Sequence, residues 1–162
     1  MRTLVIATVS VLASASSALA APAAVTVTLS PEMQAQAVAT LGEREVDDLA
    51  FGLLATVQRR LARTSTFDGE RLELVLVDAR PNRPTFKQLG DRPGLSYWSF
   101  GVGGAAIEGR AIAPDGTVRP VNFQFYETDI RSARLGGTWA DAQWAFNRFA
   151  SQLARGELVT SR

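Results

Sequence analysis

The chain has 162 residues, with 17 basic and 16 acidic side chains and neither cysteine nor histidine. Without thiol or imidazole groups, the sequence excludes Ser-His-Asp and Cys-His nucleophilic catalysis, histidine-zinc sites, thiol redox chemistry and iron–sulfur clusters. Carboxylate, tyrosine, lysine and oxygen-ligated metal chemistry remain open, and the residues nominate no cofactor. The nearly balanced charge gives no indication of nucleic-acid binding or of attraction to an acidic membrane surface.

Residues 1–20 have the layout of a secretory signal peptide. Arg2 supplies an early positive charge, an apolar run follows from Leu4 to Leu12, and Ala18-Leu19-Ala20 matches the A-x-A signature of signal peptidase. We expect cleavage before Ala21. The alternative, an uncleaved membrane anchor, is less favoured because the apolar run is short for a bilayer span and is interrupted by serine and threonine.

The segment after the expected cleavage site, residues 21–162, is predicted to form a single domain. Its 142 residues carry 16 basic and 16 acidic side chains, since the leader contains one arginine and no acidic residue. A domain of this size buries about 70% of the surface of its unfolded chain and needs no disulfides. The lack of cysteine and of N-x-[ST] sequons is typical of a bacterial periplasmic or secreted protein, with no transmembrane segment after signal cleavage.

Period-two alternation predicts a first strand from Val25 to Ser30, where Pro31 ends it. Residues 32–42 fit either a short helix or a loop. An amphipathic helix is predicted over residues 41–63, with a capping box between Thr40 and Glu43 at its start. One face of this helix is expected to meet the core, because apolar residues recur on it at steps of three and four. These residues are Val46, Leu49, Leu53, Val57 and Leu61.

A central strand is predicted over residues 71–79, after a turn at Asp68-Gly69. Leucines on one face alternate with Val75 and Val77 on the other, and apolar residues on both faces favour a position inside the sheet. The following residues, 79–96, contain three prolines and show no periodicity. They are predicted to form a long loop.

A β-hairpin is predicted over residues 103–127. Two segments of alternating polarity are joined there by Pro114-Asp115-Gly116-Thr117. In such a turn proline presets φ, aspartate bonds its own backbone and glycine takes a positive φ.

The stretch before the hairpin spells G-x-G-x-x-A with Gly101, Gly103 and Ala106, a pattern also found in dinucleotide-binding turns. Such a turn must open a helix whose N-terminus meets the pyrophosphate. Only seven residues separate Ala106 from Pro114, and they alternate like a strand. We therefore interpret the glycines as permitting a bulge or a close backbone approach where the chain joins the sheet.

A second amphipathic helix is predicted from residue 138, with a capping box between Thr138 and Asp141 and a stop at Gly156. Its apolar face consists of Trp139, Ala142, Phe146, Phe149 and Leu153. The order strand, helix, strand, hairpin, helix predicts an α+β fold: a two-layer sandwich in which two helices back a mostly antiparallel four-stranded sheet.

The proline-rich loop holds the candidate binding residues. A long connection in a small domain is often either a mobile surface loop or a recognition element. Its cations could hold a carboxylate, a phosphate or an acidic partner surface, and its aromatics, including Phe86, could stack on a partner or belong to the core. The candidates are Arg80, Arg83, Lys87, Arg92, Tyr97 and Trp98.

The acidic residues offer weaker sites. Asp47 and Asp48 are adjacent on a helix, so they project in different directions and favour a solvated face over a metal site. Glu127 and Asp129 could offer oxygens to Ca²⁺, but the dense ligand pattern of such sites is missing, and no metal is expected. Two acids such as Glu73 and Glu108 could form a glycosidase-like pair, although the sequence does not favour one pair over another.

Most of the segment after the leader resembles small exported domains of unknown function from proteobacteria. The likeness is carried by VTVTLSPE, the helix start at Gly42-Glu43, GERLELVLVDA, the hairpin around APDGTVRPVNFQFYE, and TWADAQWAFNRFASQLA. A vaguer similarity is to the α+β domains of periplasmic envelope-assembly proteins, such as the amino-terminal domain of TolB. Neither resemblance implies catalytic residues, and the lipid-anchor cysteine common among envelope lipoproteins has no counterpart here.

Two functions follow as hypotheses. The first is a non-enzymatic periplasmic domain that binds a protein or envelope component through residues 79–98 and the neighbouring aromatics. The second is a carboxylate-based hydrolase or small-molecule binder with a cleft between sheet and helices, which would show two converging carboxyl groups in an apolar pocket.

Overall fold

The structure, a computed structural model, describes residues 23–131 and 136–158. The predicted signal peptide, residues 1–20, lies outside the described residues. In chain order the elements are β1 (Ala24–Leu29), α1 (Pro31–Gln36), the π-helical turn η1 (Ala37–Leu41), α2 (Glu43–Leu61), β2 (Arg71–Arg80), α3 (Phe86–Asp91), β3 (Gly104–Ile112), β4 (Val118–Tyr126) and α4 (Ala140–Ala154).

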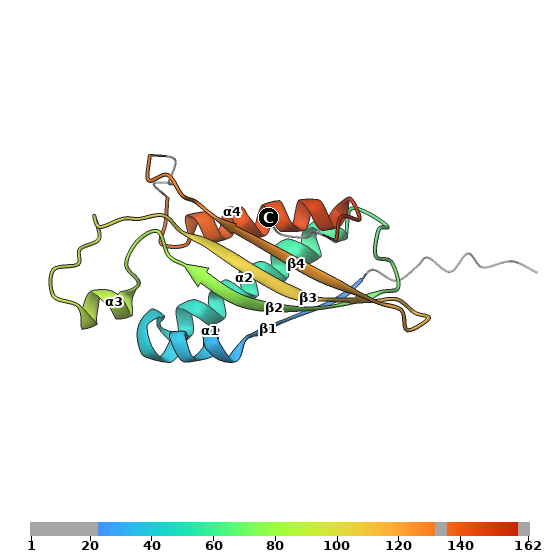
Figure 1. The fold of residues 1–162 in the computed structure, drawn as a ribbon, viewed down its shortest axis with the longest axis horizontal. Coiled ribbons are helices and arrows are strands. Elements are labelled where there is room, and N and C mark those ends of the chain that lie inside the picture. Colours follow the sequence, from blue (N-terminus) through green and yellow to red (C-terminus); the bar gives the residue numbers. More distant parts are fainter. Residues whose placement is uncertain (1–22, 132–135, 159–162) are drawn as a thin grey trace, which may run out of the picture.

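The four strands form one sheet in the order β1-β2-β3-β4. β1 runs parallel to β2, whereas the β2–β3 and β3–β4 pairs are antiparallel. Helices α2 and α4 cover one face of this sheet, and none of the described helices lies on the other, helix-free face (Figure 1). The predicted α+β fold, with a mostly antiparallel four-stranded sheet backed by helices, is confirmed.

The core fills the space between the sheet and the helices. The three leucines of β2, Leu72, Leu74 and Leu76, are buried there, as are all five residues of the predicted α2 stripe. β2 lies between β1 and β3, which confirms its predicted central position. From α4, Phe149 packs against Phe123 of β4 with ring centroids 5.5 Å apart. Burial of each such phenylalanine side chain contributes on the order of 1.5–3 kcal/mol to the free energy of folding.

Both capping boxes predicted at helix starts are wrong. The Thr40 hydroxyl donates to the Gln36 carbonyl instead. α2 begins after Gly42, which has a φ of 96°, a backbone conformation that residues with a side chain rarely adopt. At the second helix, Trp139 is the N-cap and gives no side-chain cap. The Asp141 carboxylate points to partners far away in the sequence, because those bonds are buried and outcompete a local cap.

The segment predicted as a loop throughout contains the short helix α3. A capping box does occur there: Thr85 Oγ1 accepts from the Gln88 N–H, and the Gln88 side chain accepts from the Thr85 N–H. Prolines at 81, 84 and 93 flank the helix without interrupting it, so their number alone did not exclude it.

The close backbone approach interpreted from the sequence occurs at Gly103 and at the adjacent Gly104, whereas a Cβ on Gly101 would meet nothing within 4 Å. A Cβ on Gly103 would lie 2.6 Å from the Arg80 carbonyl oxygen, and one on Gly104 would lie 2.6 Å from the Tyr126 Cα. β3 starts at Gly104, so a strand follows the glycines where a dinucleotide turn requires a helix.

The hairpin and its turn are also as predicted, with Gly116 at a φ of 86°. Over the residues that the structure describes, none of the helices has the length and apolar character needed to cross a bilayer.

Candidate functional site

Residues 81–103, which connect β2 to β3 and include α3, are named the aromatic loop here. The loop extends past the end of the sheet at one side of the molecule (Figure 1). Its aromatic side chains face solvent: Phe86 is 72% exposed, Tyr97 57% and Trp98 84%. The Phe86 and Tyr97 rings meet edge to face with centroids 6.1 Å apart. Further exposed apolar side chains in the loop are Leu95, Phe100 and Val102.

A buried pair of polar residues ties the two ends of the aromatic loop together. Asn82 Nδ2 donates to Asp141 Oδ2 at 2.6 Å, and Asp141 N–H donates back to Asn82 Oδ1 at 2.8 Å. The same Asp141 oxygen accepts from the Gly103 N–H at 3.0 Å, at the far end of the loop. Asn82 also binds both backbone groups of Gly101. Buried hydrogen bonds of this kind, out of water, fix the loop base on the first turn of α4.

Arg83 connects the aromatic loop to the backbone before α4. Its guanidinium donates to the carbonyl of Tyr97 at 2.8 Å and to the carbonyl of Gly136 at 2.9 Å. The backbone that carries the exposed tyrosine is therefore positioned by Arg83. This predicted binding residue therefore bonds to the backbone of the loop and of residue 136.

Glu45 of α2 joins three helices. One carboxylate oxygen accepts from the Phe86 N–H at 2.8 Å, and the other accepts from the Trp139 indole N–H at 3.2 Å. The first residue of α3 and the N-cap of α4 are thus fixed to α2. These bonds orient the helix that presents Phe86.

We expect Thr85→Ala to loosen α3 without unfolding the domain. The change removes the cap hydroxyl at a buried position, and losing an N-cap typically costs about 1 kcal/mol of helix stability. The measurement is amide hydrogen exchange at Gln88, which should become faster. Thr85→Ser keeps the hydroxyl and should leave that exchange rate unchanged, and equal rates in both variants would contradict the cap.

The other predicted cations are distributed differently. Arg80 lies on the helix-free face of the sheet, where it pairs with Asp78 at 3.2 Å and stacks over the Tyr126 ring at 4.3 Å. Lys87 pairs with Asp91 at 2.9 Å within α3. Arg92 is exposed at the end of that helix. Of the predicted site, Arg92, Tyr97 and Trp98 are exposed and Lys87 is partly exposed in the aromatic loop, whereas Arg80 lies at the end of β2 on the helix-free face.

Tyr126, which contacts Arg80 and Asp78 on the helix-free face, has a perturbed pKa. The Tyr126 hydroxyl donates to Asp78 Oδ2 at 2.7 Å. Burial raises the pKa of Tyr126, and the neighbouring Asp78 carboxylate raises it further. The tyrosine hydroxyl therefore stays protonated over the physiological pH range, and it donates to the same Asp78 oxygen that pairs with Arg80.

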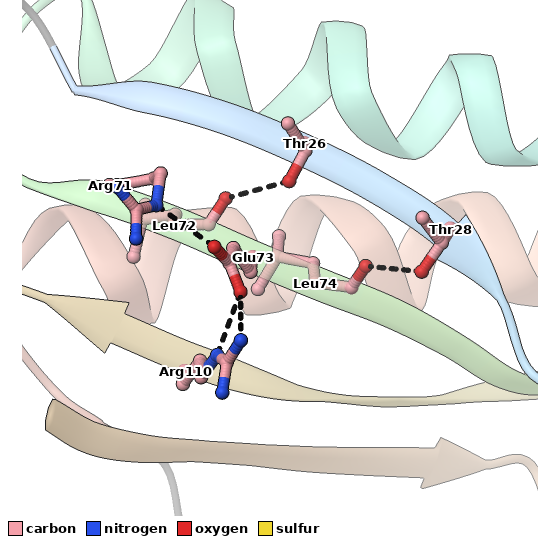
Figure 2. A network of polar contacts seen from close by, with 7 residues as sticks. All are labelled: Thr26, Thr28, Arg71, Leu72, Glu73, Leu74 and Arg110. Atoms are coloured by element: carbon pink, nitrogen blue, oxygen red, sulfur yellow. Dashed lines mark hydrogen bonds and ion pairs between the residues drawn. The ribbon is translucent and has the colours of Figure 1, made fainter.

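The helix-free face of the sheet carries a charged cluster at its centre. Glu73 accepts from Arg110 at 2.7 Å and from Arg71 at 2.9 Å (Figure 2). The hydrogen bond from Arg110, followed by the one from Arg71, lowers the pKa of Glu73. Its partner in the hypothetical glycosidase pair, Glu108, is exposed beside it in a shallow depression of about 490 Å³. The depression is lined by residues of β1, β2 and β3.

A cleft of about 430 Å³ lies between the outer sides of α2 and α4. Its lining includes Glu45, Asp48, Phe51 and Trp139. The cleft hypothesised for a small molecule was expected between sheet and helices, where the structure has its packed core. Both oxygens of Glu45 already accept hydrogen bonds from the protein.

The remaining acidic candidates bind nearby groups. Glu127 accepts from the N–H groups of Thr128 and Asp129, and Asp129 pairs with Arg131 at 3.1 Å, which lowers the pKa of Asp129. Within residues 23–131 and 136–158, no three acidic side chains converge as a metal site would need.

Sequence reasoning missed the residues that organise the loop. Asn82 and Asp141 are 59 positions apart, and no local pattern links them. Phe100 had a detectable signal, because it continues the run of aromatics after Tyr97 and Trp98. Comparisons of the sequence with protein-family models and with curated proteins give no match.

Proposed function

We propose that the protein is a non-enzymatic binding domain that presents the aromatic loop to a partner protein. The observation that carries the proposal is the exposure of Phe86, Tyr97 and Trp98 on a loop whose base is fixed by the buried Asn82–Asp141 pair. Contiguous exposed apolar side chains mark interaction sites on soluble domains. Export to the periplasm, predicted from residues 1–20, is part of the same proposal.

Preorganisation supports this function. Binding is weakened when side chains and loops must be ordered, at a cost of about 0.5–1.5 kcal/mol per side chain. Here the Arg83 bonds to Tyr97 and Gly136 and the Asn82 bonds to Gly101 already order the loop backbone. Tryptophan and tyrosine also dominate interface energetics because they bury large, fairly rigid surfaces.

Charge indicates the chemistry of the partner. Lys87 follows Phe86 in α3 and forms an ion pair with Asp91, whereas Arg92 is exposed at the end of this helix. An apolar partner pocket with an acidic rim would match this surface, since rim charges mainly steer association and select partners. The partner class is a protein of the cell envelope.

The test is photo-crosslinking in intact cells with a photoreactive residue at position 98, followed by binding measurements with the purified partner. Trp98→Ser is expected to weaken the affinity by about 30-fold or more, because a central hot-spot residue contributes about 2 kcal/mol or more. The matched control is Phe51→Ser, which removes an aromatic side chain of similar exposure (70%) from α2. That variant should bind as the natural chain does.

Two results would contradict the proposal. One is equal affinity for the partner in the Trp98 and Phe51 variants. The other is sedimentation of the natural chain with phospholipid vesicles but no protein crosslink from position 98, which would make the aromatic loop a membrane anchor.

A further inference from the structure

The two edge strands of the sheet differ in whether another strand can pair with them. In the hairpin, Ala113 N–H bonds to Thr117, and at the far end Glu127 N–H bonds to Gly103. Odd-numbered residues of β4 therefore bond to β3, and even-numbered residues point their backbone groups to the free edge. Pro120 occupies one of these even positions. It has no N–H, so it blocks strand addition at β4 without weakening the hairpin.

β1 has no such protection. Its sequence, Ala-Val-Thr-Val-Thr-Leu, contains no proline and no charge, and its pairing with β2 has no bulge. Ala24 N–H bonds to the Glu70 carbonyl at 3.0 Å and Ser30 N–H bonds to the Leu76 carbonyl at 3.1 Å. Even-numbered residues thus bond to β2, and Val25, Val27 and Leu29 turn their N–H and C=O groups to the free edge. In the sheet formed by the described residues, no strand pairs with that edge.

We propose that β1 pairs antiparallel with β1 of a second copy of this chain, forming a two-fold symmetric dimer. With the axis at Val27, Val27 lies opposite its own copy, and Val25 lies opposite Leu29 of the second copy. Every bond in this register uses the outward groups of odd-numbered residues, and the β1–β2 ladder stays intact. The Leu29 carbonyl also accepts from Gln34 Nε2 at 3.2 Å, and a carbonyl has a second lone pair for the new bond.

The side chains on both faces fit this pairing. On the helix-free face, Thr26 lies opposite Thr28 of the second copy, and Figure 2 shows both hydroxyls turned back to the carbonyls of β2. Threonine pairs stabilise adjacent strands, and no like charges meet. On the other face, Val25 of the second copy lies next to Leu29. There a groove of about 340 Å³ borders Leu29. Its apolar lining is Leu29, Ala37 and the exposed Val38, which Val25 would contact, and its polar lining is Gln34, Glu43 and Asp47.

The two edges together favour a second copy as the occupant and a closed dimer as the product. An unprotected edge pairs with another unprotected edge, and β1 of a second copy is self-complementary under a two-fold axis. Because Pro120 blocks β4, the dimer cannot extend into a longer assembly. The pairing involves no residue of the aromatic loop, so it stands or falls independently of the proposed function.

Disulfide trapping tests the register, and the natural chain offers no competing thiol because it contains no cysteine. Thr26→Cys and Thr28→Cys are made separately in the full chain and mixed before mild oxidation. Opposed residues in such a non-hydrogen-bonded pair have Cα atoms about 4.5 Å apart, within disulfide range, whereas residue 26 of each copy is too far from its own equivalent. The expected result is a covalent dimer from the mixture and little from either variant alone. Equal crosslinking in all three samples, or none, would overturn the proposal.

Charge variants test the pairing without a crosslink. Thr26→Lys combined with Thr28→Lys places lysines opposite each other, so sedimentation should show loss of the dimer. Thr26→Lys combined with Thr28→Glu is the matched control, because lysine then faces glutamate, and its dimer should persist. Both side chains are exposed, and circular dichroism checks that both variants fold. A natural chain that is monomeric at about 100 μM, where a dimer of micromolar Kd would form, contradicts the proposal, as does a dimer that Trp98→Ser disrupts.

Discussion

Gly104→Ala is expected to destabilise the domain by about 3–5 kcal/mol, enough to leave much of the protein unfolded. A Cβ at this position would overlap the Phe125 carbonyl oxygen and lie 2.6 Å from the Tyr126 Cα, so the β3–β4 backbones would have to separate. The φ of 152° adds strain for any residue with a side chain. Because the clash is with backbone, rotation of a side chain cannot relieve it, and overpacking is then costly.

Urea denaturation measures this effect, and Gly101→Ala is the matched control. Gly101 lies three residues before Gly104, at the end of the aromatic loop, and a Cβ there meets nothing within 4 Å. Its variant should stay within about 0.5 kcal/mol of the natural chain, as surface substitutions usually do. If the two variants had the same denaturation midpoint, the close approach of β3 and β4 at Gly104 would be wrong.

Asp141→Ala is expected to destabilise the domain by about 3–5 kcal/mol and to release the aromatic loop. The substitution leaves Asn82 Nδ2 and the Gly103 N–H without their shared acceptor in a buried environment. Each unsatisfied buried donor costs about 1–3 kcal/mol. Because the hydrogen bonds of Asp141 to Asn82 and to Gly103, at the two ends of the loop, are both lost, amide exchange at Gly101 and Gly103 should accelerate more than exchange in β2.

Thermal denaturation with hydrogen exchange checks this prediction, and Asp129→Ala provides the control. Asp129 makes its bonds to Arg131 two residues away, so its loss should change the free energy of unfolding by less than about 1 kcal/mol. A stable Asp141→Ala variant with unchanged exchange at Gly103 would show that the Asn82–Asp141 pair does not fix the loop.

The predicted recognition element consists of two kinds of residues. Tyr97 and Trp98 are exposed, as a docking surface requires, and Arg83 donates a hydrogen bond to the Tyr97 carbonyl. Arg80 instead pairs with Asp78 and stacks over Tyr126 on the helix-free face of the sheet. A stretch of sequence rich in arginines and aromatics could not distinguish these roles, because the partners of each cation come from other parts of the chain.

The sequence by itself determined the elements that depend on a repeating pattern. The α2 stripe, the alternation in β2 and β4 and the turn at Gly116 were all predicted, because side-chain periodicity and backbone preference act within a few residues. The tertiary structure decided what depends on distant partners. Asp141 bonds to Asn82 and not to a local cap, since the free energy of a buried hydrogen bond depends on which groups the fold brings together. The exposure of Trp98 and the unpaired edge of β1 likewise follow from packing and strand order, which no local pattern contains.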